Sequence, residues 1–463
     1  MFSTLFIKEI QQLLYSFRFQ LSLIIVLLVF TIGTIAFIRL YSEEKANYFV
    51  YHKEQLKNLE EQAKNASHLA TLRKNYVLEP RSNSIISDCK EKMFPNQFIY
   101  SAYNVFNLEV RHDNVNPLLK PVQNLSWSFI VSVCMSFLAL LFAFDTISGE
   151  KEDHTLALTL SNQISRGKIL WAKYASILSV ITATTVLGIL ISILIMSISG
   201  KILINTDFLI ETGGFITITF LLIALVTVFG LLSSVFSRNS SVSLLISLCF
   251  WLFFAIIIPN TSVYWANKLF PIEHRNEVEA KIAQGYEDLC NNAPPGSWSS
   301  SGDPFYDRHK LRADLQMKLM DNEKKFNLSY INDMFHQFEE TRSITLLSPI
   351  AQFDNLNEVN LGGGYRRLKE NWNDLQNYQI QFLEWFKAFD AKDPKSPHWY
   401  NPNESYSTSW KSVSISEVPV YTEKIIPFSS RILQSGKYIA LLLAYTAILF
   451  FISFVLFVKY DVR

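Results

Sequence analysis

Six stretches of this sequence contain no Asp, Glu, Lys or Arg, and each is long enough to cross a lipid bilayer. A hydrocarbon core about 30 Å thick requires roughly 20 helical residues, and helices of a soluble core seldom run so far without a charge. The spans that these stretches predict are residues 19–38, 124–145, 174–200, 212–237, 242–267 and 438–458. The sequence therefore predicts a mainly α-helical, polytopic membrane protein with six transmembrane helices.

The Lys and Arg residues of the short loops predict which side of the membrane holds the two termini. Six spans place both termini on one side, and basic residues favour the cytoplasmic ends of spans. With cytoplasmic termini, the basic residues on the inner side are Lys8, Arg18, Lys151, Arg166, Lys168, Lys173, Arg238, Lys459 and Arg463. The short outer loop 201–211 holds only Lys201. We therefore expect both termini, the turn 238–241 and the tail 459–463 in the cytoplasm.

Two long polar segments, 39–123 and 268–437, are extracytoplasmic in this orientation, and their patterns predict mostly helical structure. The expected helices are residues 42–76, which end before Pro80, and residues 272–290, 307–338 and 365–389. The loop 291–302 is rich in Asn, Pro, Gly and Ser, which favour turns. We expect this loop and residues 394–419 to be irregular.

The first 18 residues predict an amphipathic helix that lies along the cytoplasmic membrane surface. Apolar residues recur there at spacings of three and four, and charged and amide side chains occupy the other side. The apolar set is Phe2, Leu5, Phe6, Ile10, Leu13, Leu14 and Phe17. A cytoplasmic extension of the first span is the alternative that so short a segment leaves open.

Charge balance and missing motifs exclude several classes of function. The 42 Lys and Arg residues against 41 Asp and Glu leave a net charge of +1, so nucleic acid is not an expected partner. An ion-coupled carrier would require ionisable residues inside its spans to bind the coupling ion, and the span interiors of this chain hold none. The chain also has no phosphate-binding loop, no His-x-x-x-His pair and no Gly-x-Ser-x-Gly motif. We expect a non-catalytic chain without metal or cofactor, to which a partner supplies any energy for transport.

The predicted cytoplasmic loop 146–173 carries the most informative motif. Its characteristic residues are Ser148-Gly-Glu-Lys-Glu152, Thr155, Leu156, Ser165, Arg166 and Lys173. In these residues the loop resembles the type-two ATP-binding-cassette (ABC) permeases, in particular the group associated with copper-enzyme maturation and its relatives with large extracytoplasmic domains. His154 and Ala172 stand where that group usually has glycine. Leu347-Ser-Pro349 and the terminal Lys459-Tyr-Asp-Val-Arg463 are similar to the same group.

This resemblance implies that the loop is a coupling helix, which in the family docks into a cleft of a separate ATPase subunit. ATP and Mg²⁺ would then bind to the partner. The candidate coupling residues are Ser148, Gly149, Glu150, Lys151, Glu152, Thr155, Leu156, Leu158, Leu160, Ser165 and Arg166. The loop's own chemistry is compatible, because Asp153 can cap a short helix from Thr155 and Ser165 can cap the third span. The alternative is a solvated turn whose basic residues only anchor the spans.

The resemblance further implies a permease subunit of an ABC exporter in a bacterial inner membrane. Its partners would be the ATPase subunit, the lipid bilayer, and a second copy or a paralogue that completes a dimer. One alternative is an ABC-type mechanotransmission subunit, which moves its extracytoplasmic domains against a periplasmic or cell-wall partner without transport. An anchored binding module is a third class, but one span would be enough for it.

Three residues outside the loop predict local features. Cys89 and Cys290 fall in the two outer segments, where an oxidising periplasm would permit a disulfide between them. Pro259 removes a helix hydrogen bond from the fifth span. It is therefore either a hinge or simply the point at which that span ends.

Overall fold

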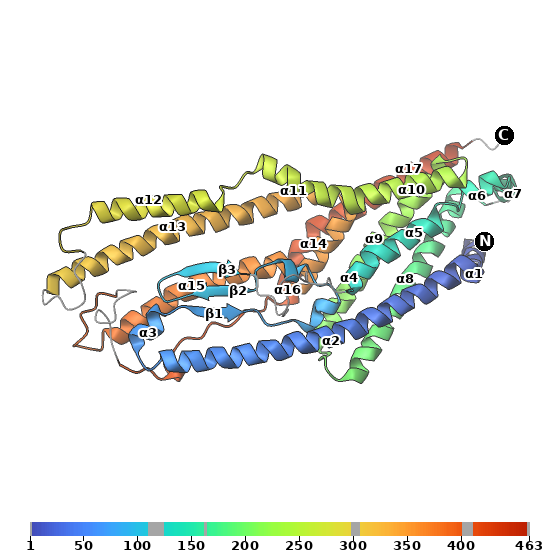
Figure 1. Ribbon diagram of the computed structural model, residues 1–463. Coiled ribbons are helices and arrows are strands. Elements are labelled where there is room, and N and C mark those ends of the chain that lie inside the picture. Colours follow the sequence, from blue (N-terminus) through green and yellow to red (C-terminus); the bar gives the residue numbers. More distant parts are fainter. Residues whose placement is uncertain (1, 110–124, 162–163, 298–305, 401–410, 461–463) are drawn as a thin grey trace.

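The computed structural model describes residues 2–109, 125–161, 164–297, 306–400 and 411–460. The molecule is elongated, with a helix bundle at one end and a domain of helices and strands at the other (Figure 1). Four elements lie together at the end of the bundle away from the domain: helix α1 (Phe2–Tyr15), the end of α17 (Gly436–Lys459), and the short helices α6 (Ser148–Glu152) and α7 (Leu156–Ser161). This end is called the loop end below, and the opposite end of the bundle is called the domain end.

Six helical segments in the described part of the chain are long and apolar enough to cross a membrane, which confirms the predicted fold class. They are α2 (Phe17–Gln62), α4–η3–α5–α6 (Trp127–Glu152), α8 (Arg166–Ser199), α9 (Thr206–Phe236), α10–η4–α11 (Ser240–Leu269) and α16–η7–α17 (Phe428–Lys459). Helix α9 is the most buried of the six and packs against α5 (Ser136–Ala143), α8, α10 and α17. The span α10–η4–α11 is the least buried.

Two of these spans contain a π-helical turn. The second span consists of α4 (Trp127–Phe129), the π-helix η3 (Ile130–Met135), α5 and α6 (Ser148–Glu152). The fifth consists of α10 (Ser240–Leu252), the π-helix η4 (Phe253–Ile257) and α11 (Ile258–Leu269). The helix does not end at Pro259, because this residue lies in the first turn of α11, where a missing N–H is tolerated. The wider π turn before it accommodates the ring.

The two polar segments combine into one domain. Its antiparallel sheet has the order β1 (Lys74–Val77), β2 (Gln97–Tyr100) and β3 (Val105–Glu109), with Lys74 opposite Tyr100 and Phe98 opposite Leu108. The sheet shares a core with α3 (Ala66–Thr71) and α15 (Gly364–Asp390). Phe98, Trp372 and Phe382 are fully buried in that core. The first polar segment therefore contributes the sheet, and the second contributes the long helix that covers it.

The expected helix over residues 42–76 is wrong in its second half. Helix α2 ends at Gln62, and residues Lys74–Val77 form strand β1. The remaining elements of the domain are η1 (Ser82–Ile85), η2 (Glu91–Met93), α12 (Arg275–Asn291), α13 (Tyr306–Thr345), α14 (Pro349–Leu361) and η6 (Ile415–Glu417). The sixth span begins with α16 (Phe428–Ile432) and η7 (Leu433–Ser435). The error in predicting a helix over β1 arises because a four-residue strand is too short to show a periodicity that distinguishes it from a polar helix.

Helix α14 connects the domain with the bundle. Its residues Phe353 and Leu356 are fully buried in the same core as Phe215 of α9. The motif Leu347-Ser-Pro349 forms its start, since the Ser348 hydroxyl accepts a hydrogen bond from the Ala351 N–H at 3.2 Å and Pro349 is the first helical residue. The motif therefore begins a helix that is packed against the bundle.

Cys89 and Cys290 are both free thiols in the structure, so the predicted disulfide is not formed. Cys89 packs against Gly363 and Gly364 at the start of α15, whereas Cys290 lies near the end of α12. Burial raises the pKa of the Cys89 thiol well above its usual value. Each cysteine is therefore held by its own element rather than by the other.

Replacing Gly188 in α8 with Val is expected to separate α8 from α2. A Cβ atom on Gly188 would lie 2.5 Å from the ring of Phe30, which is fully buried and cannot move away. Overpacking of this kind costs about 1–3 kcal/mol, so the thermal unfolding temperature of the full-length protein in detergent should fall.

Gly213 of α9 is the matched control, because a Cβ there has no atom within 4 Å. The Gly213→Val variant should unfold close to the wild-type temperature. Equal unfolding temperatures for both variants would show that the α2–α8 contact at Gly188 does not constrain the bundle.

Lys74 makes the stability of the domain depend on pH. Its ammonium group is buried under strand β1, donates to the carbonyls of Leu69 and Leu72, and lies 5.2 Å from the ring centre of Phe382. Burial lowers the pKa of Lys74 to about 7 from 10.5. Between these values the folded state binds fewer protons than the unfolded state, so stability rises with pH across this range.

The Lys74→Met variant should lose this part of the pH dependence, with the largest gain in unfolding temperature at about pH 6. Tryptophan fluorescence can follow the transition, because Trp372 is fully buried in the domain core. Lys64→Met, at an exposed position, should retain the wild-type pH profile. An unchanged profile in Lys74→Met would contradict the assignment.

Candidate functional site

The loop 146–173 forms two short helices at the loop end of the bundle (Figure 1). Helix α6 covers Ser148–Glu152 and α7 covers Leu156–Ser161. Helix α8 begins at Arg166 and re-enters the bundle. The charged motif Ser148–Glu152 therefore lies at the end of the second span, and α7 extends beyond it.

Glu150 takes part in a cluster of charges that joins three helices. Lys173 of α8 lies 2.8 Å from the Glu150 carboxylate and 3.2 Å from the carboxylate of Glu9 in α1. The Lys173 side chain is only 5% exposed, so its pairing with the two carboxylates is needed to offset its desolvation. This cluster fixes α1 and α6 to the start of α8.

Ser148 and Lys151 bind the end of α9. The backbone N–H of Ser148 donates to the Ser234 hydroxyl at 2.9 Å, and the Lys151 ammonium donates to the carbonyls of Val235 and, at 2.9 Å, Ser237. A cation at the C-terminal end of a helix satisfies carbonyls that have no partner within the helix and has a favourable interaction with the helix dipole. Residues of α6 thereby close the end of α9.

Glu152 and Arg166 bind the ends of two further helices. The Glu152 carboxylate accepts a hydrogen bond of 3.0 Å from the N–H of Ser240, the first residue of α10. The Arg166 guanidinium donates to the carbonyls of Val458 at 2.9 Å and Tyr460 at 2.7 Å, which end α17. The signs of both charges match the helix ends that they bind.

Helix α7 has one buried and one exposed face. Leu156 is buried among Ile169, Val235 and Phe457, and Leu160 packs against the same cluster. Leu158 is 70% exposed, and Thr155 is also exposed. The surface that this part of the chain offers to another molecule therefore consists of α7 and the turn before it.

Neither predicted capping residue makes the expected capping bond, although Ser165 has the expected position. Asp153 ends α6 and does not begin α7. Ser165 stands at the N-cap position of α8, but its side chain makes no capping bond.

The position of Gly149 has room for a small side chain, since a Cβ there would be 3.7 Å from its nearest neighbour. Among the described residues, no group of His, Cys, Asp and Glu is arranged to hold a metal ion.

Sequence reasoning missed Glu9, Ser234 and Ser240 as partners of the motif, because they are far from it along the chain. It did note His154, which stands where the resembled group has glycine. His154 has a φ of +55°, in the left-handed region that glycine adopts without strain. The turn between α6 and α7 therefore has the backbone conformation that a glycine would allow.

Replacing His154 with Gly should stabilise this turn. A non-glycine residue in the left-handed region costs about 1 kcal/mol, so hydrogen exchange of the amides of His154 and Thr155 should slow by up to about fivefold. These amides donate to the carbonyls of Lys151 and Glu150. Hydrogen-exchange mass spectrometry of peptides that cover α6 and α7 measures the effect.

Asp153→Gly serves as the control, because Asp153 has a φ of −82° that any residue adopts. Its exchange should become faster, since glycine there only adds freedom to the open state. Faster exchange in both variants would contradict strain at His154.

These features define a multi-pass α-helical membrane protein. It has six apolar helices, a domain at one end of them, and at the other end a short, exposed helical loop that binds the ends of several spans. The chain belongs to the ABC-2 transporter family, since the model of the family described as ABC-2 family transporter protein matches residues 3–462. The resemblance to type-two ABC permeases is thereby confirmed at the level of the family. No curated protein matches the sequence.

Proposed function

We propose that this chain is the permease subunit of an ATP-driven exporter and that a separate ATPase subunit docks on α6 and α7. Membership of the ABC-2 transporter family supports the permease function. The loop supports the place of docking, because it is the exposed helical connection at the end of the bundle away from the domain. ATP and Mg²⁺ bind to the partner in this proposal, and this chain is not catalytic.

The observation that carries the proposal is the number of helices that the loop holds. Glu150 is linked through Lys173 to α8 and α1, Lys151 binds the end of α9, and Glu152 binds the start of α10. Arg166, the first residue of α8, binds the end of α17. A displacement of α6 therefore acts on α8, α9 and α10, and through Lys173 on α1, while Arg166 extends these links to α17.

The geometry supports a smaller set of ATPase contacts than the one that the resemblance implies. Glu150 and Lys151 are directed into the bundle and bind its helices, and the Glu152 carboxylate is bound to the start of α10. In α7 and the turn before it, the exposed residues include the candidates Thr155 and Leu158, together with Asp153 and His154, which were not candidates. We propose that the first set transmits the movement and that the second set receives it.

The least buried span supports a second copy or a paralogue as a further partner. The span α10–η4–α11 contributes few buried residues within the chain, so its apolar side chains face lipid or another subunit. In the exporter that we propose, two permeases meet across such a face in a bacterial inner membrane, with cytoplasmic termini. The likeness of the loop to the copper-enzyme-maturation group rests on the short motif and remains a prediction.

The continuity of α2 supports an alternative, a mechanotransmission subunit. This helix runs unbroken from the loop end into the domain over 46 residues, about 70 Å. A tilt of its membrane part would displace the domain against a partner outside the membrane, without any cargo. The two functions share the ATPase and the loop, and they differ in whether a substrate crosses the bundle.

Leu158→Asp is expected to weaken docking of the ATPase. An aspartate in place of this leucine would place a charge without a partner in the interface, which costs about 2 kcal/mol or more, so the affinity should fall by about thirtyfold or more. Co-purification of the permease with the ATPase that is expressed beside it, followed by a titration with purified components, measures this loss.

Leu203→Asp is the matched control, because Leu203 is 78% exposed and lies in the loop before α9 at the domain end. This variant should bind the ATPase as the wild type does. If Leu158→Asp and Leu203→Asp co-purify equally well with the ATPase, α7 is not the docking surface.

A further inference from the structure

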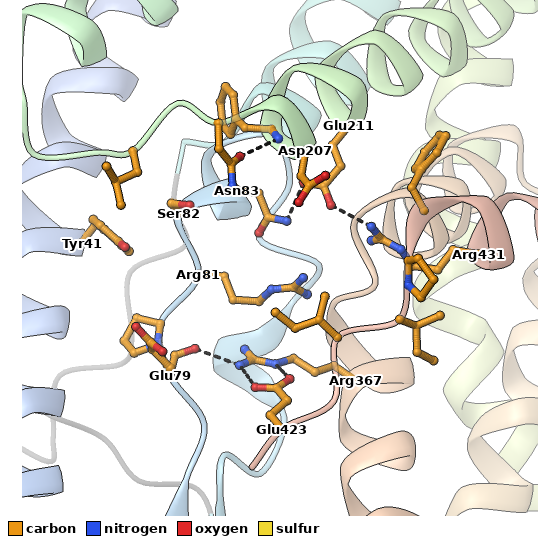
Figure 2. A pocket seen from close by; sticks show the side chains of 18 of the residues that line it. Tyr41, Glu79, Arg81, Ser82, Asn83, Asp207, Glu211, Arg367, Glu423 and Arg431 are labelled. Carbon is orange, nitrogen blue, oxygen red and sulfur yellow. Dashed lines mark hydrogen bonds and ion pairs between the residues drawn. The ribbon is translucent and has the colours of Figure 1, made fainter.

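A cavity of about 520 Å³ lies where the bundle meets the domain, at the opposite end from the loop (Figure 2). Segments far apart in the sequence line it. They are α2 at Tyr41 and Lys45, residues 79–83, the start of α9 at 203–211, Arg367, and residues 423–431. The cavity has the size of a small-molecule site and is too large for a single inorganic ion.

Arg431 is the central cation of this cavity. Its guanidinium lies 2.9 Å from the Glu211 carboxylate, and the two side chains are only 5% and 6% exposed. The Nε and Nη1 atoms of Arg431 are buried, and no hydrogen-bond partner for them exists in the described part of the chain. Only one nitrogen of this buried guanidinium therefore donates a hydrogen bond within that part, and the N–H groups on the other two need an acceptor from another molecule.

Arg81 is a second cation directed at the same place. Its guanidinium donates to the carbonyl of Gly362 at 2.7 Å, and Arg431 Nη1 is 2.9 Å from where a Cβ of Gly362 would lie. Two guanidinium groups thus converge on one residue, which has a φ of +62° and ends α14.

The lining carries equal numbers of cations and carboxylates, so a preference for an anion can only be local to Arg81 and Arg431. The cations are Lys45, Arg81, Arg367 and Arg431, and the carboxylates are Glu79, Asp207, Glu211 and Glu423. Glu211 is bound by Arg431 and by the Asn83 amide, and Glu423 is bound by Arg367 through bonds of 2.6 and 2.7 Å. Within the described residues, Arg81 makes no ion pair with a carboxylate. Figure 2 shows Arg81 pointing into the space between the Glu211–Arg431 and Arg367–Glu423 pairs.

The border of the cavity is apolar and lies where the membrane spans end. Leu203 and Ile425 are 78% and 77% exposed. Tyr41 and Lys45 follow the charge-free part of α2 by one or two helical turns, and Arg431 precedes that of α17. Cationic donors inside the cavity and apolar side chains at its border fit a molecule with an anionic head and an apolar tail.

We propose that this cavity binds the phosphate group of an anionic phospholipid from the leaflet on the domain side of the membrane. The phosphate oxygens accept from Arg81 and from the free donors of Arg431, and the acyl chains leave past Leu203 and Ile425. The site does not depend on docking of an ATPase, so it can be tested on this chain alone.

The test measures binding of phosphatidylglycerol and of phosphatidylcholine to the full-length protein in detergent by native mass spectrometry. The wild type should bind phosphatidylglycerol more tightly, and Arg81→Gln should lower its affinity about tenfold, as loss of a charged hydrogen bond predicts. The Arg81 side chain is partly exposed and makes one hydrogen bond within the described part of the chain, to the carbonyl of Gly362, so the variant should fold. Its unfolding temperature without lipid checks this point.

Lys424→Gln is the matched control, since it removes one positive charge beside the cavity from a side chain that is 77% exposed and does not line it. Equal affinities of Arg81→Gln and Lys424→Gln, or equal binding of the two lipids by the wild type, would overturn the proposal. Glycerol 3-phosphate distinguishes the source of the phosphate. It should bind far more weakly than the lipid, and binding of equal affinity would overturn a lipid source in favour of a soluble phosphate ester.

Discussion

Helix ends carry backbone groups that the helix itself cannot satisfy, and this constraint organises the loop end of the bundle. Each α-helix leaves four N–H groups and four C=O groups without intrahelical partners. Lys151 donates to the carbonyls that end α9, Arg166 donates to those that end α17, and Glu152 accepts from the first amide of α10. Because all three side chains belong to one short stretch of chain, helices that are distant in sequence are held by a single loop.

The signs of these charges explain why so polar a motif is directed into the bundle. Cations are favourable at the carbonyl end of a helix and anions at its N–H end, and each of the three side chains meets the end that suits it. Lys173 adds a buried cation that needs both Glu9 and Glu150. Removing one member of such a cluster would leave an uncompensated charge, so the motif is required for the bundle itself. The exposed turn and α7 are free of this requirement.

The sequence predicted the spans well because the cost of placing charge in hydrocarbon acts on every residue of a span. Helix α9 begins at Thr206, before the charge-free stretch, and it can include Glu211 because Arg431 and Asn83 bind the carboxylate of that residue. Strand β1 could not be predicted, because four residues are too few to show the alternation of polar and apolar side chains that marks a strand. The motif was enough to predict the loop, but not that Glu150 pairs with Lys173, because only the fold brings these two residues together. The cavity depends even more on the fold, because it joins five separate segments.

Helix α9 connects the two ends at which charge is concentrated. Its 31 residues span about 46 Å, with Lys151 bound at its last turn and Glu211 paired with Arg431 near its first. It is the most buried span and touches four other helices of the bundle, so close packing prevents one neighbour from absorbing a displacement of α9 alone. A movement imposed on the loop would therefore be carried along α9 as a unit. At the domain end it would change the Glu211–Arg431 distance, and with it the hydrogen bonding of the buried Arg431 guanidinium.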